Sequence, residues 1–234
     1  MDENDIKHIA IIMDGNRRWA EQKGLGTLQG HKMGSDAAKR VIKACSDLKI
    51  KYLTLYAFST ENWKRPEYEV NGLMILLKTV INKNVEELME KGVRLRAIGR
   101  LDELPSETRK AVFKAMERTS GNSDLNLIVA LNYGGRSEII DATKKICGDL
   151  EKKKIRMEDL NEEVFRKYLY LPDVPDPEIL IRSSGELRIS NFLLWQISYS
   201  EFWFSNKLWP DFGKEDIVNA IETFRKRERR FGLR

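Results

Sequence analysis

Short runs of apolar, often β-branched residues alternate along this chain with longer stretches in which apolar residues recur at helical spacing. The short runs predict strands at residues 8–13, 52–57, 93–98, 125–131 and 179–182. The longer stretches predict helices at residues 34–48, 67–91, 105–119, 137–152, 161–168, 190–196 and 214–229. This alternation is typical of an α/β fold with a mainly parallel central sheet and helices on both faces. Because no repeat or low-complexity linker interrupts the pattern, we expect a single domain spanning residues 1–234.

The predicted helix at 67–91 carries more apolar residues than one packing face requires. One stripe at helical spacing consists of Val70, Leu73, Met74, Leu77, Ile81, Val85 and Leu88. Ile75, Leu76 and Val80 widen the apolar arc beyond that stripe. Packing against the sheet is the simpler interpretation. A slot for a hydrocarbon substrate is the alternative, and the pattern is compatible with both.

Polar segments follow four of the predicted strands at the point where each strand ends. These segments are residues 14–18, 59–63, 132–136 and 182–186. In an open parallel sheet the carboxyl ends of the strands meet at one edge, where ligands bind. We therefore expect the four segments to form a common binding site.

The first polar segment, Asp14-Gly15-Asn16-Arg17-Arg18, combines a carboxylate with two guanidinium groups. A carboxylate can hold a hard cation, and arginines bind phosphate through paired hydrogen bonds. The combination indicates chemistry on a diphosphate. Taken alone, the same segment could be an ordinary strand-to-helix turn that Asp14 and Asn16 cap.

A second cluster suits the same ligand. Arg182, Arg188 and Ser190 surround a turn at Gly185 and precede a predicted helix. Backbone N–H groups at a helix start, together with arginines and a hydroxyl, can bind a diphosphate. Capping of that helix by Ser190 is the simpler alternative, but it leaves the two arginines that flank the glycine unexplained.

Two further residues have open interpretations. Glu201 lies within an aromatic run, where burial requires a partner for its charge. That partner could be Mg²⁺ shared with Asp14 and diphosphate oxygens, or an arginine. His31 is one of 2 histidines, and a lone histidine is more often structural than catalytic, although it lies near the first polar segment in sequence. His8, inside a predicted strand, is interpreted as structural.

Composition limits the class of protein. The chain has 234 residues, of which 41% are hydrophobic, so it can bury a sizeable core. Its net charge of +5 suits an anionic ligand or membrane surface but does not demand nucleic acid. Cys45 and Cys147 lack CxxC spacing, which favours reduced and buried cysteines in a cytoplasmic protein. The acidic first residues and the absence of a long apolar run argue against a signal peptide and a transmembrane helix.

Several signatures of other classes are absent. The sequence lacks GxxxxGK[ST], a GxGxxG after the first strand, GxSxG, HExxH and the DDxxD pattern of all-helical prenyl synthases. The basic run at 225–234 is compatible with a solvated helix end, with nucleic-acid binding, or with a tail that reaches a neighbouring subunit. The solvated helix end is the simplest of these, because no nucleic-acid-binding motif accompanies the run.

The chain closely resembles the cis-prenyltransferases, the undecaprenyl diphosphate synthase family. The matching segments follow the family's order along nearly the whole sequence. They are residues 8–20 (HIAIIMDGNRRWA), 30–32 (GHK), 56–66 (YAFSTENWKRP), 93–99 (VRLRAIG), 132–136 (NYGGR), 182–196 (RSSGELRISNFLLWQ), 208–212 (LWPDF) and 228–232 (ERRFG).

The resemblance implies a homodimeric enzyme that adds isopentenyl diphosphate units in cis to an allylic diphosphate. Asp14 would ligate Mg²⁺ and help the allylic diphosphate to leave, and Glu201 would be the second Mg²⁺ ligand. The allylic diphosphate would be bound by Gly15, Asn16, Arg17, Arg18 and Trp19, with support from His31. Isopentenyl diphosphate would be bound by Arg182, Arg188, Ile189 and Ser190.

Asn62 matches the position proposed to receive the proton lost from isopentenyl diphosphate. Its neighbours in the same wall would be Ser59, Thr60, Glu61, Trp63 and Arg65. An amide is a poor base, so a diphosphate oxygen is an alternative final acceptor. The tail motif at 230–232 would reach across the dimer, and the product would leave through peripheral contact with the membrane.

Two departures from the family pattern stand out. Thr27 occupies a place where many members carry an arginine, and Arg17, often glycine in relatives, could compensate. The usual RTSGE segment has Ser183 in place of its threonine, which retains the hydroxyl group. Asp14, Asn62 and Glu201 are unaffected.

The prediction is therefore a Mg²⁺-dependent cis-polyprenyl diphosphate synthase that supplies a lipid carrier. One rival is a non-catalytic subunit of a heteromeric prenyltransferase, but such subunits lack the aspartate segment that this chain keeps. The other rival is a basic nucleic-acid binder, which salt-sensitive binding would reveal. Product length and the choice between a farnesyl and a geranylgeranyl starter stay open; the lack of an insertion after Leu88 favours a product of medium length.

Overall fold

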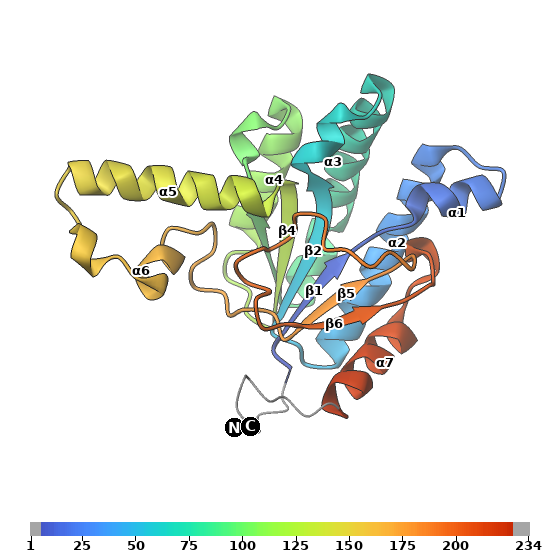
Figure 1. Cartoon of the computed structure of the whole chain (residues 1–234). Coiled ribbons are helices and arrows are strands. Elements are labelled where there is room, and N and C mark those ends of the chain that lie inside the picture. Colours follow the sequence, from blue (N-terminus) through green and yellow to red (C-terminus); the bar gives the residue numbers. More distant parts are fainter. Residues whose placement is uncertain (1–5, 227–234) are drawn as a thin grey trace.

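A six-stranded parallel sheet forms the centre of the computed structural model, which describes residues 6–226 (Figure 1). The strand order is β3-β4-β2-β1-β5-β6. The strands are β1 His8–Ile12, β2 Tyr52–Ser59, β3 Val93–Ile98, β4 Leu125–Tyr133, β5 Ile179–Arg182 and β6 Glu201–Phe204. The five predicted strands are confirmed, and β1 is buried at every position, as expected for a strand covered on both faces.

The sequence pattern did not predict β6. This strand lies at the edge of the sheet, pairs only with β5, and is partly exposed. Its aromatic residues are favoured in strands, but the run is only 4 residues long, begins with the charged Glu201 and lacks the buried apolar pattern of the other strands.

Helices cover the sheet and extend beyond it. They are α1 Asn16–Gln22, α2 Thr27–Asp47, α3 Glu67–Glu90, α4 Ser106–Arg118, α5 Gly135–Glu151, α6 Glu162–Arg166 and α7 Lys214–Arg225. Six of them overlap the predicted helices, and α1 was not predicted. The prediction extended the last helix to residue 229, but α7 ends at Arg225, and residues from 227 lie outside the described part of the chain.

The predicted start of α2 was late because two glycines weaken the helical pattern of its first turns. Both glycines are required by the close packing of α1 on α2. A Cβ atom on Gly30 would lie 2.2 Å from the backbone oxygen of Asn16, and one on Gly34 would lie 2.2 Å from the Oδ1 atom of the same residue. Here tertiary packing outweighs helix propensity.

The predicted helix at 190–196 is wrong. The segment consists of turns, and Ser190, Asn191 and Leu193 have φ angles of 48°, 62° and 44°. A right-handed helix cannot include such residues. The apolar positions that suggested a helix instead fold down onto the sheet, where Phe192, Leu193 and Ile197 are buried.

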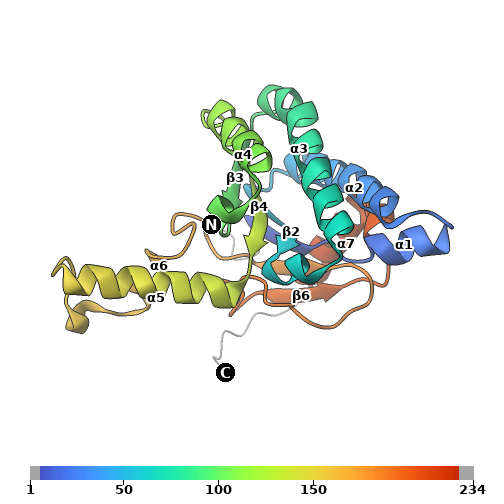
Figure 2. The ribbon, with the colours of Figure 1, turned by 90° about the horizontal axis from the view of Figure 1, so that it is seen from above.

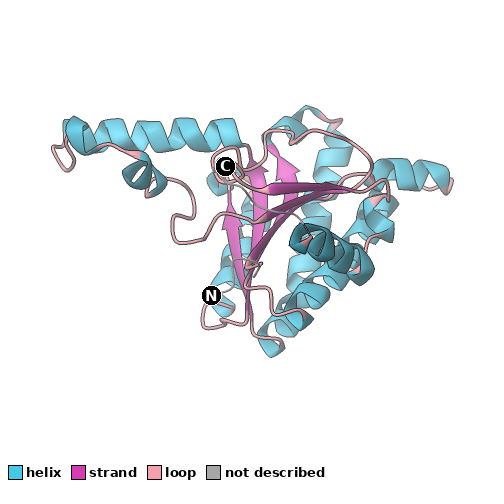
Figure 3. Ribbon diagram, turned by 60° about the horizontal axis from the view of Figure 1, so that its bottom comes forward, coloured by secondary structure: helices cyan, strands magenta, loops and turns pink. Residues whose placement is uncertain are grey.

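The two faces of the sheet are covered differently (Figures 2 and 3). On one face, buried residues of the strands pack against α2, α3, α4 and α7. On the other, the segment around Phe192 packs on Ala10, Ile12 and Leu180, and α5 projects away from the sheet (Figure 1). The predicted single-domain α/β fold with a parallel central sheet is confirmed. Among residues 6–226, no helix combines the length and apolarity needed to cross a membrane. The predicted burial of both cysteines is wrong for one of them, because Cys45 is buried and Cys147 is exposed on α5.

Candidate active site

Two adjoining cavities lie at and below the carboxyl edge of the sheet. The first is polar and has a volume of about 540 Å³, and the second is mostly apolar and has a volume of about 230 Å³. The polar cavity is lined by Ile12, Met13, Asp14, Asn16, His31, Tyr56, Ala57, Ser59, Glu61, Asn62, Arg65, Leu73, Arg182, Arg188, Ser190 and Asn191. The two cavities share Met13, Asn16, His31, Ala57 and Leu73. A ligand with a charged head and a hydrocarbon tail could occupy both.

Asp14 follows β1 and is held in the polar cavity by residues at the carboxyl end of β5. Its backbone N–H donates to the Oγ atom of Ser183 at 2.9 Å, and that hydroxyl donates to the Asp14 carbonyl oxygen at 2.7 Å. Its Oδ2 atom accepts a hydrogen bond from Arg182 at 2.8 Å. Burial alone would raise the pKa of Asp14, but the hydrogen bond and charge of Arg182 outweigh it, so the pKa lies below the ordinary value. The carboxylate is therefore charged at neutral pH.

Arg182 joins Asp14 to the second polar cluster. Its side chain is only 4% exposed and donates to the Oγ atom of Ser190 at 2.7 Å and to the carbonyl oxygen of Arg188. The carboxyl end of β5 thus brings the two predicted clusters together. Ser190 does not cap a helix, because no helix starts there, so the capping alternative is wrong. Arg188 is largely exposed at the rim of the cavity and pairs with Glu186.

The other residues that follow Asp14 differ in whether they line a cavity. Gly15 has a φ of 105°, and a Cβ atom there would lie 2.9 Å from the side chain of Leu208, so only glycine fits. Asn16 lines both cavities. Arg17, Arg18 and Trp19 line neither cavity.

Each of those three side chains has a partner elsewhere. Arg17 pairs with Glu21 at 2.8 Å on the surface. Arg18 donates to the Ser184 carbonyl oxygen at 3.1 Å, and the indole N–H of Trp19 donates to Asp211 at 2.9 Å. Arg17 and Arg18 would have to change rotamer to reach a ligand in the polar cavity.

The segment after β2 forms a second wall. Ser59, Glu61, Asn62 and Arg65 line the polar cavity. The first three belong to the polar segment 59–63 that follows the strand in sequence. The Asn62 Oδ1 atom accepts a hydrogen bond from the backbone N–H of Ser59 at 3.0 Å, which fixes the amide. Thr60 lies outside the cavity lining and donates to Glu61 at 3.2 Å.

Trp63 also lies outside this lining. It anchors the segment after β2 to residues of the neighbouring strand β4. Its indole N–H donates to Asn132 at 2.7 Å, and Asn132 in turn donates to the carbonyl oxygen of Arg100 at 3.0 Å. The polar segment after β4 therefore supports the site rather than lining it.

His31 lies where the two cavities meet. Its Nδ1 atom is 3.4 Å from the Nδ2 atom of Asn16, and its Nε2 atom is 3.8 Å from Glu69. Burial, together with the charge of Arg65, lowers the pKa of His31 to about 4, so the ring is neutral at neutral pH. Two atoms at this junction, Asn16 Oδ1 and His31 Nε2, are buried without a hydrogen-bond partner in the described part of the chain. A polar ligand group could satisfy them.

Sequence reasoning missed Glu69 and Asn191. Glu69 is buried at the start of α3 and holds Arg65 at 2.9 Å. Asn191 donates to Glu61 at 2.9 Å; burial would raise the pKa of Glu61, but this hydrogen bond helps to lower it below its ordinary value. Glu69 could have been found from its position as a charged residue on the apolar face of a helix. Asn191 could have been found from its position directly after Ser190.

Glu201 does not lie near Asp14 within one chain. It opens β6 in register with Ile179, whereas Arg182, the Asp14 partner, pairs with Phe204 at the other end of the same two strands. Ile189 packs against the buried cluster that contains Ile12 and does not line either cavity. In residues 6–226, no three His, Cys, Asp or Glu side chains gather into a metal-binding group. The tail motif at 230–232 lies outside the described residues.

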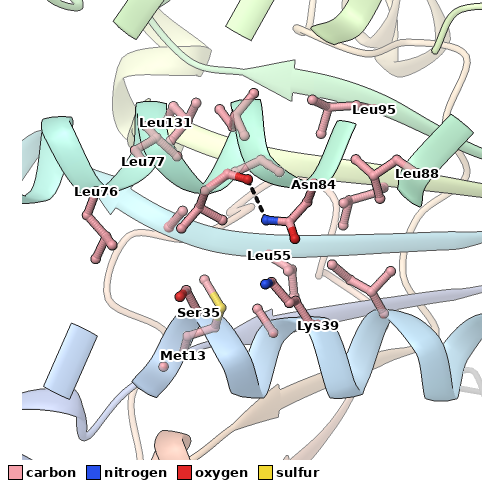
Figure 4. A pocket seen from close by; sticks show the side chains of 18 of the residues that line it. Met13, Ser35, Lys39, Leu55, Leu76, Leu77, Asn84, Leu88, Leu95 and Leu131 are labelled. Carbon is pink, nitrogen blue, oxygen red and sulfur yellow. Dashed lines mark hydrogen bonds between the residues drawn. The ribbon is translucent and has the colours of Figure 1, made fainter. Parts of the chain in front are cut away.

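The apolar cavity lies between α2, α3 and the sheet (Figure 4). Of the three extra apolar residues of α3, Leu76 and Val80 line the cavity and Ile75 is exposed. Most of the packing stripe lines it as well, namely Leu73, Met74, Leu77, Ile81 and Leu88. Both interpretations of the 67–91 pattern therefore hold, because the same face of α3 packs toward the sheet and forms a wall of the cavity.

Comparisons with known proteins agree with this geometry. Residues 12–232 match the model of a prenyltransferase family described as "Putative undecaprenyl diphosphate synthase". Isoprenyl transferases from Clostridium perfringens and Heliobacterium mobile are 53% and 51% identical to the chain, over 97% of it and over 89% and 87% of their own lengths. A crystal structure of lavandulyl diphosphate synthase from Lavandula x intermedia with dimethylallyl diphosphate has a TM-score of 0.96 at 37% identity and covers 99% of this chain and 100% of its own. A "probable undecaprenyl diphosphate synthase" from Campylobacter jejuni has a TM-score of 0.81 at 37% identity, over 97% and 99%.

Proposed function

Because the chain belongs to the undecaprenyl diphosphate synthase family and is an isoprenyl transferase, we propose that it is a Mg²⁺-dependent cis-polyprenyl diphosphate synthase. It would add isopentenyl diphosphate repeatedly to a farnesyl or geranylgeranyl diphosphate starter and so make a lipid-carrier precursor. The observation that carries this proposal is the opening of an arginine-lined polar cavity directly into an apolar one. The first suits diphosphates and the second suits the growing hydrocarbon.

The two diphosphates would share the polar cavity. The isopentenyl diphosphate would contact Arg182, Arg188 and Ser190, which already lie together around one corner of it. The allylic diphosphate would lie near Asp14 and Asn16, with Arg17 and Arg18 turning inward to complete the binding. The neutral His31 would donate or accept a hydrogen bond there without adding charge. Arginine pairs bind phosphate oxygens in a fixed, bidentate geometry.

The donor set around Asp14 fits Mg²⁺. A magnesium site commonly uses one or two carboxylates, substrate phosphate oxygens and water, and Asp14 is a charged, partly exposed carboxylate beside the place for a diphosphate. When bound, Mg²⁺ would neutralise charge that accumulates on the departing diphosphate. Glu201 would contribute as a second ligand only from a partner subunit, because it lies at the opposite ends of the strands in the same chain.

Bond formation would be driven by positioning and by electrostatic stabilisation. As the allylic carbon loses its diphosphate, Arg17 and Arg18 would stabilise the negative charge that develops on the departing group. The fixed amide of Asn62 would orient isopentenyl diphosphate. Because an amide is a poor base, a diphosphate oxygen would accept the proton that isopentenyl diphosphate loses. Holding both substrates in one cavity would supply much of the remaining rate enhancement.

The proposal also covers the oligomeric state, the location and the partners of the enzyme. We expect a homodimer in the cytoplasm that contacts the membrane peripherally when its product leaves, and we expect no nucleic-acid partner. The modest net charge of +5 is consistent with substrate binding and does not require nucleic acid.

The direct test is incorporation of radiolabelled isopentenyl diphosphate by the purified chain, with allylic starters of several lengths. We expect Mg²⁺-dependent polyprenyl product with the wild type and a loss of about 10³-fold with Asp14→Ala. Asp36→Ala, which removes a partly exposed aspartate from α2, is the matched control and should keep full activity. A chain that incorporates nothing with any starter would be a non-catalytic subunit instead.

A further inference from the structure

One asparagine side chain links three of the segments that follow strands at the carboxyl edge of the sheet. Asn191 lies in the segment after β5, directly after Ser190. Its Nδ2 atom donates to Glu61, in the segment after β2, at 2.9 Å. Its Oδ1 atom accepts from the backbone N–H of Arg136, in the first turn of α5 after β4, at 2.9 Å. Both ends of the Asn191 amide therefore bond to segments that follow other strands.

The surroundings of Asn191 fit this link closely. Its φ angle is 62°, in the left-handed region, which asparagine tolerates better than most other residues with a side chain. A Cβ atom on Gly134 would lie 2.7 Å from the Asn191 Nδ2 atom and 2.8 Å from the Thr60 Oγ1 atom, so this glycine leaves room for the link. Thr60 in turn donates to Glu61 at 3.2 Å, so both carboxylate oxygens of Glu61 accept hydrogen bonds.

The link joins two parts of the polar cavity that have different tasks in the proposed function. On one side, Arg182 and Ser190 would hold the diphosphate of isopentenyl diphosphate. On the other side, Asn62, next to Glu61, would orient the reacting end of the same molecule. Because this substrate is short and its length is fixed by covalent bonds, the two sets of contacts must keep a constant spacing. A displacement of about 1 Å between reacting groups can lower a rate by about 10²-fold.

We propose that Asn191 is a positioning residue for prenyl transfer, and that it keeps Arg182 and Ser190 at a fixed spacing from Asn62. This inference rests on the proposed function and adds to it a residue that acts through Glu61 rather than on a reacting atom. Loss of the link leaves the arginine contacts with the diphosphate in place, so isopentenyl diphosphate still binds. The reacting end of the substrate is then held less accurately, so bond formation is slower.

The first experiment measures kcat and KM for isopentenyl diphosphate in Asn191→Gly. Glycine adopts the same φ angle without strain and keeps the carbonyl oxygen that accepts from the N–H of Gly135, so the substitution removes only the side chain. We expect kcat, corrected for the folded fraction from urea denaturation, to fall at least about 10-fold, while KM changes by less than about threefold.

Asn206→Gly is the matched control, because Asn206 is an exposed asparagine after β6 that lines neither cavity. It should leave both constants unchanged. A rise in KM with an unchanged kcat in Asn191→Gly, or equal effects of the two substitutions, would overturn the proposal.

A pair of substitutions tests whether Asn191 acts through Glu61. Asn191→Asp keeps an acceptor for the Arg136 N–H but places a second carboxylate against that of Glu61, so kcat should fall as in Asn191→Gly. Glu61→Gln keeps an oxygen that can accept from Asn191, and its amide can also donate to an aspartate at position 191. In the Glu61→Gln background, Asn191→Asp should therefore lower kcat by less than about threefold. Equal losses in the two backgrounds would overturn the proposal.

A third measurement does not depend on turnover and so separates this inference from the proposed function. Hydrogen exchange of the backbone amides at 59–63 is compared with and without saturating inorganic pyrophosphate, in the absence of Mg²⁺. In the wild type and in Asn206→Gly, we expect pyrophosphate to slow this exchange at least about threefold, because the link couples the segment after β5 to the segment after β2. In Asn191→Gly the slowing should be confined to residues 182–191.

A wild type that makes no polyprenyl product but shows this difference in exchange would refute the proposed function and support the role of Asn191. The same slowing at 59–63 in Asn191→Gly, or no slowing there in the wild type, would overturn that role.

Discussion

The polar and the apolar cavity differ in how their walls are held. In the polar cavity, Asp14, Arg182 and Ser190 are joined by hydrogen bonds that link β1 to the segment after β5, regions about 170 residues apart. In the apolar cavity, the facing parts of α2 and α3 contribute side chains that mostly bond within their own helix, as Asn84 does. The first arrangement fixes atoms where charge develops. The second arrangement can accommodate hydrocarbons of different lengths, as a cavity for a growing chain requires.

Breaking the fixed arrangement should have the largest effect. Arg182→Met removes the buried partner of Asp14 and leaves Ser190 without its donor. We expect a loss of at least 10²-fold in kcat/KM and a fall of about 3 kcal/mol in the free energy of unfolding. Steady-state kinetics and urea denaturation measure the two. Arg166→Met, which removes a surface partner of Asp176, is the control and should change unfolding by under about 1 kcal/mol. Equal effects of the two substitutions would contradict a fixed polar cavity.

The junction between the cavities depends on close packing of α1 on α2. Gly30→Ala would place a methyl group 2.2 Å from the Asn16 carbonyl oxygen and so displace Asn16, which lines both cavities. We expect a destabilisation of about 2 kcal/mol and a rise in KM for the allylic substrate. Gly148→Ala is the matched control in α5, because a Cβ atom there meets nothing within 4 Å. It should stabilise the protein by about 0.5 kcal/mol. A Gly30→Ala variant as stable as the wild type would show that α1 can move without cost.

The pH dependence of the free energy of unfolding tests whether His31, at the junction of the cavities, is neutral in the folded protein. Burial lowers the pKa of both His31 and His8 to about 4 from 6.5. The unfolded chain therefore binds more protons between these values, and the folded state loses stability as pH falls from 6.5 toward 4. The slope should approach about 1.4 kcal/mol per pH unit for each histidine. His31→Gln should roughly halve it, as urea denaturation at several pH values would show; an unchanged slope would mean that His31 titrates normally.

A change in the wall of the apolar cavity should have the smallest effect on chemistry. Leu77→Ala removes apolar surface from the half of the cavity nearest the polar site. We expect KM for the allylic starter to rise about fivefold while kcat stays within about twofold. Full kinetics with a saturating second substrate would separate the two constants. A fall in kcat comparable to that of Arg182→Met would show that the cavities do not act separately.

Much of this architecture could be predicted from the sequence because the buried strands have a strong local pattern. Strands such as His8–Ile12 are apolar at nearly every position, and the polar residues after them must then meet at one edge. That reasoning predicted that Asp14, Asn62 and Arg182 share one site, and the three residues line the same cavity.

What could not be predicted depends on long-range packing. The turns at 190–197 look helical in sequence, but Phe192 and Ile197 are held by the face of the sheet. Helix α1 begins after Gly15, where a positive φ and the close approach of Leu208, nearly the whole chain away, leave no room for another residue. The position of Glu201 follows from β6 joining β5 in parallel register, which no local pattern indicates.

The most direct test of the division between the two cavities is a crystal structure with a non-hydrolysable farnesyl diphosphate analogue and Mg²⁺. We expect the diphosphate to contact Asp14 and the hydrocarbon to enter the cavity beside Leu77 and Leu131. A diphosphate bound away from Asp14, or a hydrocarbon lying on the opposite face of the sheet against Phe192, would contradict it.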